Sequence, residues 1–203
     1  MTFFMREFVV RLLKGRTSGD FSADDLPAAG RMDIACACIS NAFHISNKLR
    51  RDTVVHLVLD GPPDPPKTIT IDGREVKCLN YDERSIGFII KDALKKSKNL
   101  KLNEARDIGN GITVAKRSFE RLIREKAETK PLFYLHNKGE DIREAELCDD
   151  CVFVFGDYLG VPRNTEKLLK RIGAKRIRLG PLMLFASHCV ILVHNELDRR
   201  LIQ

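Results

Sequence analysis

The most constraining feature of the sequence is a regular alternation of apolar runs and amphipathic segments that begins at Pro131. Strands are predicted at residues 132–135, 151–155 and 175–179, and helices at residues 140–146, 165–172 and from Ser187 onward. Strands that alternate with helices pair in parallel, because each helix returns the chain to the start of the next strand. We therefore expect an α/β fold with a parallel sheet.

The first part of the chain adds two apolar runs, at residues 7–11 and 53–59, which predict further strands. The second run is apolar on both faces apart from His56, as is typical of a central strand covered by helices on both sides. Helices are predicted at about residues 34–47, 83–98 and 113–127, and residues 99–110 are expected to be irregular.

Turn residues separate these elements. The proline-rich stretch at residues 60–66 predicts a stiff loop. Asp72-Gly73 stands between two short segments of strand-like sequence, residues 68–71 and 74–77. This is the clearest turn signal in the chain, and it predicts a small β-hairpin.

Length and composition indicate one globular domain. A chain of 203 residues, 43% hydrophobic and 31% charged, can bury a single core, and we take residues 1–203 as one domain. No apolar run reaches the roughly 18 to 20 residues of a membrane span. The opening residues are charged too soon for a secretory signal. We expect a cytoplasmic protein with no membrane contact.

Six cysteines are expected to be reduced thiols, because a cytoplasmic chain of this size does not need disulfides. Cys148 and Cys151 have the spacing of half a zinc site, but two carboxylates stand between them and no histidine partner follows, so we predict no metal. Cys189 could act as a nucleophile with His188 or His194. Both spacings are poor on a helix, since adjacent residues point apart and residues five apart do not face each other.

The net charge of +7 comes mainly from the middle third of the chain, residues 61–130. A basic region of this kind fits a partner that carries phosphates, and RNA fits better than a membrane. The alternative is a solvated, lysine-rich helix face without a partner. Composition alone favours this alternative.

The parallel sheet predicts where a ligand binds, because ligands of such sheets lie beyond the carboxyl ends of the strands. Three loops meet there, at residues 135–137, 156–160 and 180–184. The sequence has no dinucleotide fingerprint, Walker loop or nucleophile elbow. The ligand should then be held by backbone groups and apolar walls, a description that suits an adenosyl cofactor.

Two segments of the last third, FVFGDYLG and RLGPLMLFASHCVILVHNELD, look like the end of the SPOUT methyltransferases. Several earlier blocks narrow the resemblance. They are MREFVV, GRMDIACACISNAF, LRRDTVVHLVLDGPPDPP, DERSIGFIIKDALK and YLHNKGEDI. In order and spacing they resemble the archaeal tRNA pseudouridine-54 N1-methyltransferases. The resemblance covers nearly the whole chain from Met5 onward.

This resemblance implies S-adenosylmethionine as cofactor, tRNA as partner, and a homodimer with its active site at the subunit interface. It also implies a SPOUT-type sheet whose last part, residues 131–203, forms a deep trefoil knot around the cofactor. The residues that it implies around the cofactor are Leu135, Gly156, Leu179, Gly180, Pro181, Leu182, Met183, Leu184 and Cys189.

Methylation of N1 of pseudouridine requires that this nitrogen lose its proton. Asp33 is our candidate to accept the proton or to orient the base, and the related rRNA pseudouridine methyltransferases resemble this chain in an Arg-x-Asp here. The alternative role of Asp33 is a helix cap or a salt bridge to Arg31. The predicted RNA contacts, chosen because the guanidinium fork matches phosphate geometry, are Arg31, Arg50, Arg51 and Arg84.

Two other functions stay open at this point. The first keeps the chemistry but acts on a pseudouridine of small-subunit rRNA. The second is a non-catalytic RNA-binding or assembly factor with the same fold. Binding of S-adenosylmethionine separates the enzyme from the assembly factor, and methylation of defined RNAs separates the two substrates.

Overall fold

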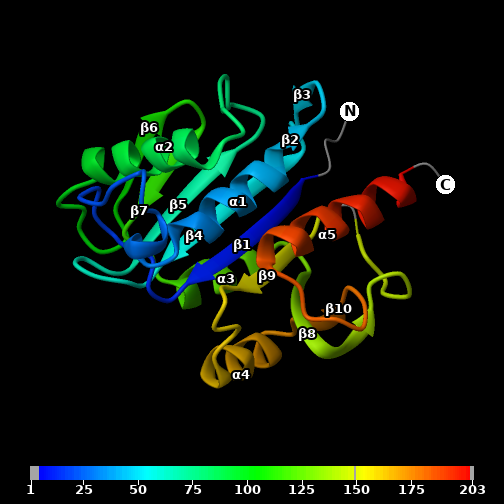
Figure 1. Ribbon diagram of the computed structural model, residues 1–203. Helices are drawn as coiled ribbons and strands as arrows, with labels where there is room; N and C mark the ends of the chain where they lie inside the picture. Colours follow the sequence, from blue (N-terminus) through cyan, green and yellow to red (C-terminus); the bar gives the residue numbers. More distant parts are fainter. Residues whose placement is uncertain (1–4, 149, 202–203) are drawn as a thin grey trace.

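One mixed sheet organises the computed structural model, which describes residues 5–148 and 150–201. Its strands lie in the order β10-β8-β9-β1-β4-β5-β7-β6 (Figure 1). The parallel half contains β1 (Arg6–Leu12), β4 (Thr53–Leu59), β8 (Leu132–Asp141), β9 (Val152–Gly156) and β10 (Lys175–Arg178). The antiparallel half continues from β4 through β5 (Lys67–Asp72), β7 (Ile112–Ala115) and β6 (Ala105–Gly109). The predicted α/β fold with a parallel core is confirmed.

Helices cover both faces of the sheet. One face carries α1 (Met32–Phe43), α2 (Glu83–Lys96) and α5 (Ala186–Arg200), and the other carries α3 (Phe119–Ala127) and α4 (Arg163–Arg171). Alternate strand residues serve the two cores: Phe8 and Phe153 pack under α1 and α5, whereas Val9 and Val154 pack under α3 and α4. Because both faces are covered, β9, most of β4 and the middle of β1 are apolar.

The predicted hairpin at residues 68–77 is wrong. Asp72-Gly73 does reverse the chain, but the backbone of residues 74–77 is turn and coil, and β5 pairs with β4 and β7. Val76 is buried in the core. The carbonyl oxygens of Gly73 and Val76 accept hydrogen bonds from Arg51. The segment after the turn therefore uses its backbone to bind a side chain and does not extend the sheet.

A hairpin forms instead further along, where β6 and β7 pair through a turn at residues 110–111. These strands fall in a stretch predicted to be irregular and then helical. The following helix begins at Phe119, with Ser118 as its cap, and not near Thr113. β6 escaped prediction because its side chains are mostly exposed, so no apolar pattern marks it.

The acidic helix predicted at residues 140–146 is also absent. Residues 140–141 instead end a ten-residue β8, which pairs with β10 through a register shift beside Arg176 and Ile177, and residues 142–145 are turn and bend. Gly139 makes this possible, because an added Cβ would lie 2.4 Å from the backbone of Ile177. A two-stranded ribbon, β2 (His44–Ile45) with β3 (Lys48–Leu49), follows α1. Within the described residues, no helix is long and apolar enough to cross a membrane.

Candidate functional site

A tight turn follows β9 at the carboxyl edge of the parallel strands. At Gly156 an added Cβ would lie 2.3 Å from the backbone of Gly160, so this position accepts no side chain. Asp157 is buried and its carboxylate accepts two backbone N–H bonds, from Leu159 (2.8 Å) and from Leu13 just after β1 (3.0 Å). The aspartate thereby fixes the turn to the end of β1. Sequence reasoning missed Asp157, although its place directly after a buried strand was a usable signal.

The loop after β10, residues 179–185, exposes most of its apolar side chains. Leu182, Met183 and Phe185 are 75%, 90% and 71% exposed, while Leu179 packs against the main core. Gly180 and Pro181 lie between these two parts of the loop. A contiguous run of exposed apolar side chains is typical of a surface that binds a ligand or another protein, since monomeric proteins rarely leave such patches uncovered.

Cys189 lies in the first turns of α5, just behind this loop. Its side chain is buried, and its Sγ is 3.9 Å from the carbonyl oxygen of Leu184. Burial raises the pKa of the Cys189 thiol to about 11, so the group is protonated at neutral pH. The position is that of a wall residue, not of an activated nucleophile.

His194 and His188 do not form a catalytic pair with Cys189. Arg6 Nη1 donates to Nδ1 of His194 (3.1 Å), so Nε2 carries the ring proton and donates to the carbonyl oxygen of Ala42 (3.0 Å). Burial lowers the pKa of His194 to about 3, which keeps the ring neutral. His188 is exposed, with its ring at the edge of the Phe185 ring.

Asp33 and Arg31 stand at the start of α1, next to the turn after β9. Arg31 Nε and Nη2 donate to the Asp33 carboxylate at 2.8 to 3.1 Å. The same guanidinium lies over the ring of Tyr158, 5.1 Å from its centre. Arg31 has a φ of 67°, a left-handed backbone that a side chain adopts only at some cost. Hydrogen bonding to Asp33 also raises the pKa of Arg31. The structure therefore brings Asp33 and the Gly156 turn together.

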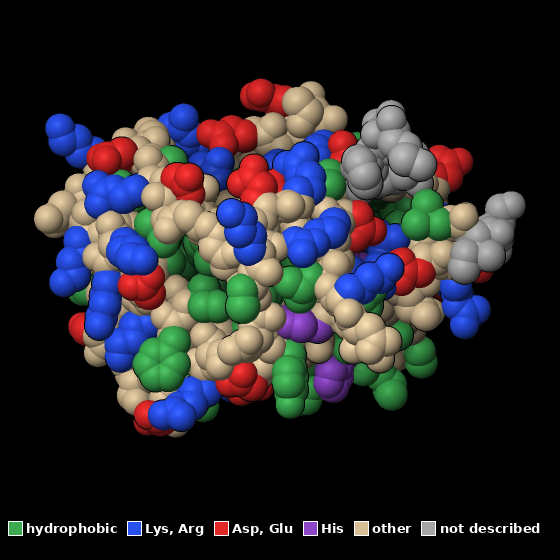
Figure 2. Space-filling model, turned by 90° about the horizontal axis from the view of Figure 1, so that it is seen from above, with side chains coloured by type: hydrophobic (Ala, Val, Ile, Leu, Met, Phe, Trp, Pro, Cys, Tyr) green, Lys and Arg blue, Asp and Glu red, His purple; other side chains and the backbone are tan. Residues whose placement is uncertain are grey.

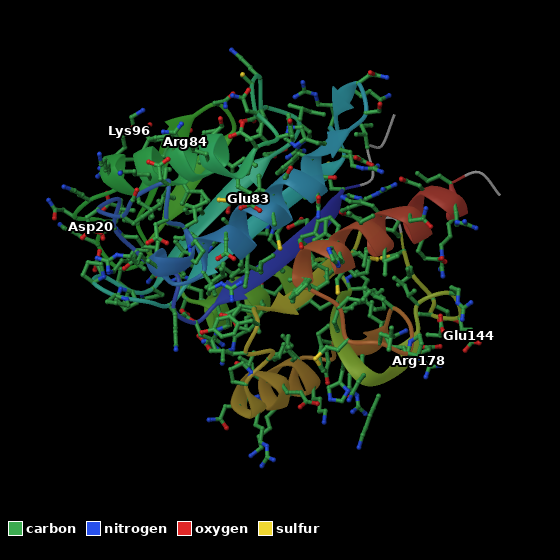
Figure 3. The ribbon with its side chains drawn as sticks, viewed as in Figure 1. Asp20, Glu83, Arg84, Lys96, Glu144 and Arg178 are labelled. Atoms are coloured by element: carbon green, nitrogen blue, oxygen red, sulfur yellow. The ribbon has the colours of Figure 1, made fainter. Side chains whose placement is uncertain are left out.

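The four predicted arginines separate into two groups. Arg31 adjoins the candidate site, and Arg84 lies on the exposed side of α2, paired with Asp24 at 2.6 Å (Figure 3). Arg50 and Arg51 lie at the opposite end of the strands. The guanidinium of Arg50 binds Asp198 of α5, and that of Arg51 binds backbone carbonyls. Both groups already hold internal partners, so the structure does not bring these two arginines into the site.

The remaining predicted cofactor residue, Leu135, lies in β8 and packs partly buried against the main core. Cys148 and Cys151 lie with their sulfur atoms 2.6 Å apart, next to the start of β9. Within residues 5–148 and 150–201, no group of three or more His, Cys, Asp and Glu side chains is placed to hold a metal ion.

Comparison with known proteins adds to this geometry. A family described as SAM-dependent RNA methyltransferase matches residues 5–202. The tRNA (pseudouridine(54)-N(1))-methyltransferase of Methanococcoides burtonii is 46% identical over 200 residues, covering 97% of this chain and 98% of the relative. The enzyme of the same name from Methanocaldococcus jannaschii is 42% identical over 201 residues, covering 97% and 98%.

A solved structure shares the fold. Nep1 of Archaeoglobus fulgidus, bound to S-adenosylhomocysteine, superposes with a TM-score of 0.63. The match covers 98% of this chain and 99% of that one, at 12% identity. Identity at this level supports a common fold and nothing finer.

Proposed function

The chain belongs to the family of SAM-dependent RNA methyltransferases, and from this premise we propose that it methylates N1 of pseudouridine 54 in the T-loop of tRNA. The relatives that carry this activity in their names match nearly the whole chain at 42 to 46% identity. The observation that carries the proposal within the structure is the placement of the Arg31–Asp33 pair beside the Gly156 turn. A candidate proton acceptor and a candidate cofactor loop thus share one edge of the sheet.

S-adenosylmethionine supplies an electrophilic methyl group, and the residues present fit such a cofactor. Gly156 lets the backbone of the turn pack closely, and Gly160 leaves bare backbone that a ligand can approach, because nothing lies within 4 Å of an added Cβ there. The apolar side chains of residues 182–185 can cover an adenine ring and an aliphatic chain. We propose that the cofactor is lined by Leu135, Gly156, Leu179, Gly180, Pro181, Leu182, Met183, Leu184 and Cys189.

The chain's own chemistry lies in Asp33 and Arg31. N1 of pseudouridine becomes nucleophilic when its proton leaves, and the Asp33 carboxylate accepts that proton. Arg31 fixes the direction of both carboxylate oxygens through its fork of donors. Tyr158 stacks on the same guanidinium and holds it toward the turn. Positioning of base and methyl donor supplies the rest of the rate enhancement, because the transfer needs no covalent enzyme intermediate. Arg84, Arg50 and Arg51 complete the proposed RNA contacts, and the last two would first have to release their internal partners.

We propose a homodimer with the active site at the subunit interface. Exposed apolar side chains continue from the loop at residues 182–185 onto α5, where Ile191 and Leu192 are 47% and 37% exposed. A second copy of the chain can cover these apolar side chains through a symmetric interface, in which both copies use the same surface. Ile191→Glu should convert the dimer to a monomer in sedimentation velocity, and a wild-type monomer at micromolar concentration would contradict the dimer.

We further propose that residues 1–203 act as one domain in which residues 131–203 form a trefoil knot. β10 lies outside β8 at the sheet edge, yet the chain after it returns to pack α5 against α1 near the sheet centre. Arg200 of α5 donates to carbonyl oxygens of Ile142 and Ala145 in the β8–β9 connection. These crossings support a threaded path. A tRNA-modifying enzyme of this kind is expected in the cytoplasm.

Two measurements test the function. Isothermal titration with S-adenosylmethionine should give one site per chain. Labelled cofactor should then transfer its methyl group to a tRNA that carries pseudouridine at position 54. A matched transcript with uridine at that position should accept none.

The contrary outcomes point to the other two functions. Lack of cofactor binding would make the chain an RNA-binding or assembly factor. Equal labelling of the two transcripts would contradict the pseudouridine substrate, and labelling of a small-subunit rRNA fragment in place of tRNA would move the substrate to rRNA.

A further inference from the structure

α4 and β10 carry a row of basic side chains that the site described above does not use. We call this set the α4–β10 patch, and all of its members are exposed: Arg163, Lys167, Lys170, Arg171, Lys175, Arg176 and Arg178. Nitrogen-tipped side chains extend from α4 away from the sheet in Figure 3. Most of the net positive charge of the sequence comes from residues 61–130, but this patch lies in the last third of the chain.

The charge of the patch is available to a partner. Many basic residues of the middle third have an acidic partner within 4.0 Å, as Arg121 has in Glu125 and Lys126 in Glu7. In the patch, Lys170 is paired with Glu166 at 3.2 Å, and Arg178 is 3.9 Å from Asp141. For the other members, the described residues offer no acidic side chain within 4.0 Å. On the face seen in Figure 2, by contrast, acidic and basic side chains are interspersed.

Stability of the fold explains only part of this patch. Cations in the last turn of a helix favour its dipole, which accounts for Lys170 and Arg171. Basic residues on an edge strand discourage pairing with other sheets, which accounts for Lys175 and Arg176. Neither reason applies to Lys167, and Arg163 stands at the first residue of α4, where the dipole disfavours a cation.

The patch adjoins the candidate cofactor loops. α4 follows the turn that contains Gly156 and Gly160, and β10 leads directly into residues 179–185. Its helical members are spaced by four, seven and eight residues from Arg163, so they share one face over about 12 Å of helix. One strand of a nucleic acid duplex presents a phosphate about every 3.4 Å along its axis, so this face spans about three phosphates.

We propose that the α4–β10 patch binds the phosphodiester backbone of the RNA beside the nucleotide that is methylated. The inference rests on the proposed function, because it assigns a surface to the same substrate. The patch reads no sequence, since lysine and arginine bind phosphates wherever they occur. Its role is to hold the RNA in place while the target base enters the Asp33 site.

The test compares two triple variants of the full chain in the presence of S-adenosylhomocysteine. One removes patch charges, by Lys167→Gln, Arg171→Gln and Arg176→Gln. The control removes the same formal charge from the end of α2 and the coil after it, by Lys95→Gln, Lys98→Gln and Lys101→Gln. Fluorescence anisotropy measures binding of pseudouridine-54 tRNA between about 50 and about 300 mM salt, a range that brackets physiological ionic strength.

The patch variant should bind tRNA about tenfold or more weakly at about 150 mM salt, and its salt slope should fall by about three, one for each lost phosphate contact. Affinity for S-adenosylmethionine and the melting temperature should match wild type. The control should lose no more than about threefold in tRNA affinity, as expected for charge removed from outside the contact.

Two results would overturn the inference. Wild-type binding by the patch variant would remove the patch from the RNA contact, and equal losses in both variants would reduce the effect to net charge. In either case wild-type protein would still methylate pseudouridine-54 tRNA, so the proposed function would stand. Failure of wild type itself to bind and methylate tRNA would instead refute the proposed function, and the inference with it.

Discussion

The two ends of the parallel strands treat charge differently. At the amino end, Glu7 of β1 is buried and binds Lys126 and Lys130, each at 2.6 Å, and His56 at 2.8 Å. At the carboxyl end, Asp33 binds only Arg31 among the described side chains, and the pair is partly exposed. Glu7 has its partners inside the protein, whereas the Arg31–Asp33 pair keeps room for a ligand. We therefore propose that the Glu7 cluster contributes stability and the Arg31–Asp33 pair contributes chemistry.

This assignment can be tested, because it predicts that variants at one end lose turnover and variants at the other end lose stability. Carboxyl-end variants should lose turnover and keep their stability. Amino-end variants should lose stability and keep turnover per folded molecule. A variant that lost both to the same degree would remove the distinction.

The largest effect is expected for Asp33→Asn. The amide keeps the size of the side chain but cannot accept a proton, so kcat should fall by roughly 10² to 10⁴-fold. Stability should fall by less than about 1 kcal/mol, because the lost ion pair is partly exposed. Single-turnover methylation and urea unfolding measure the two quantities.

Asp92→Asn is the matched control, because it removes a carboxylate from an exposed helical ion pair with Lys96. Turnover of this control should equal that of wild type. If Asp33→Asn also kept wild-type turnover, Asp33 would serve only as the ion-pair partner of Arg31, and the proton acceptor would have to be sought elsewhere.

Glu7→Gln should have the largest effect on stability. Burial raises the pKa of Glu7, but the hydrogen bond to His56 and the charge of Lys126 outweigh it and hold the pKa well below its usual range. The variant leaves two partly buried lysines without their common partner, at a cost of roughly 3 kcal/mol. The urea midpoint should fall accordingly, while kcat of the folded fraction stays unchanged.

An exposed carboxylate provides the comparison for this variant. Glu144→Gln, in the connection after β8, should change the free energy of unfolding by less than about 0.5 kcal/mol. A Glu7→Gln protein as stable as the Glu144→Gln protein would show that the buried network adds nothing. Loss of turnover in a fully folded Glu7→Gln protein would extend the chemistry to the amino end.

Acid should lower the stability of the protein through His194, which lies at the same end of the strands. Burial lowers its folded pKa from 6.5 to about 3, so the unfolded chain takes up the proton first. The stability that His194 contributes is complete above pH 6.5 and is lost as the pH falls toward 3, by up to about 1.4 kcal/mol per pH unit.

His194→Gln tests this dependence, because glutamine can still donate to Ala42 and accept from Arg6 but does not titrate between pH 7 and 5. Urea midpoints over that range should change less steeply in the variant. His56 is also buried with a lowered pKa, so part of the slope should remain. Identical slopes in variant and wild type would assign the acid sensitivity to other groups.

Local patterns predicted the central strands well, because β9, most of β4 and the middle of β1 are apolar runs. They failed where pairing is long-range. β6 has an exposed polar sequence and exists because β7 lies beside it, and residues 140–141 extend β8 because β10 accepts them. Asp72-Gly73 predicted the turn correctly, but the strand before it does not pair with residues 74–77. The sequence of residues 74–77 does not indicate that β5 pairs with β4 and β7.

The candidate site shows the same limit. The sheet rule predicted the loop at residues 156–160, and the family resemblance added Asp33, but only the folded chain brings the Arg31–Asp33 pair beside Tyr158. In the sequence, Arg50 and Arg51 are as plausible RNA contacts as Arg31. Residue type alone does not show that Asp198 already binds Arg50 and that backbone carbonyls already bind Arg51. Asp157 was missed because its two amide donors come from the turn and from a distant strand end.

The smallest effect is expected for Cys189→Ala, at the carboxyl end but without a chemical role. Burial raises the pKa of the thiol to about 11, so no thiolate is present to attack the base. Loss of the sulfur from an apolar wall costs about 0.8 kcal/mol of contact, or about fourfold in the KM for S-adenosylmethionine, with kcat within about twofold. Cys78→Ala, at an exposed thiol, provides the control. A loss of kcat of about 10²-fold in Cys189→Ala alone would place the thiol in the reaction. The chemistry would then lie in the C-terminal segment that we propose as the cofactor site, and Asp33 would serve only to orient the base.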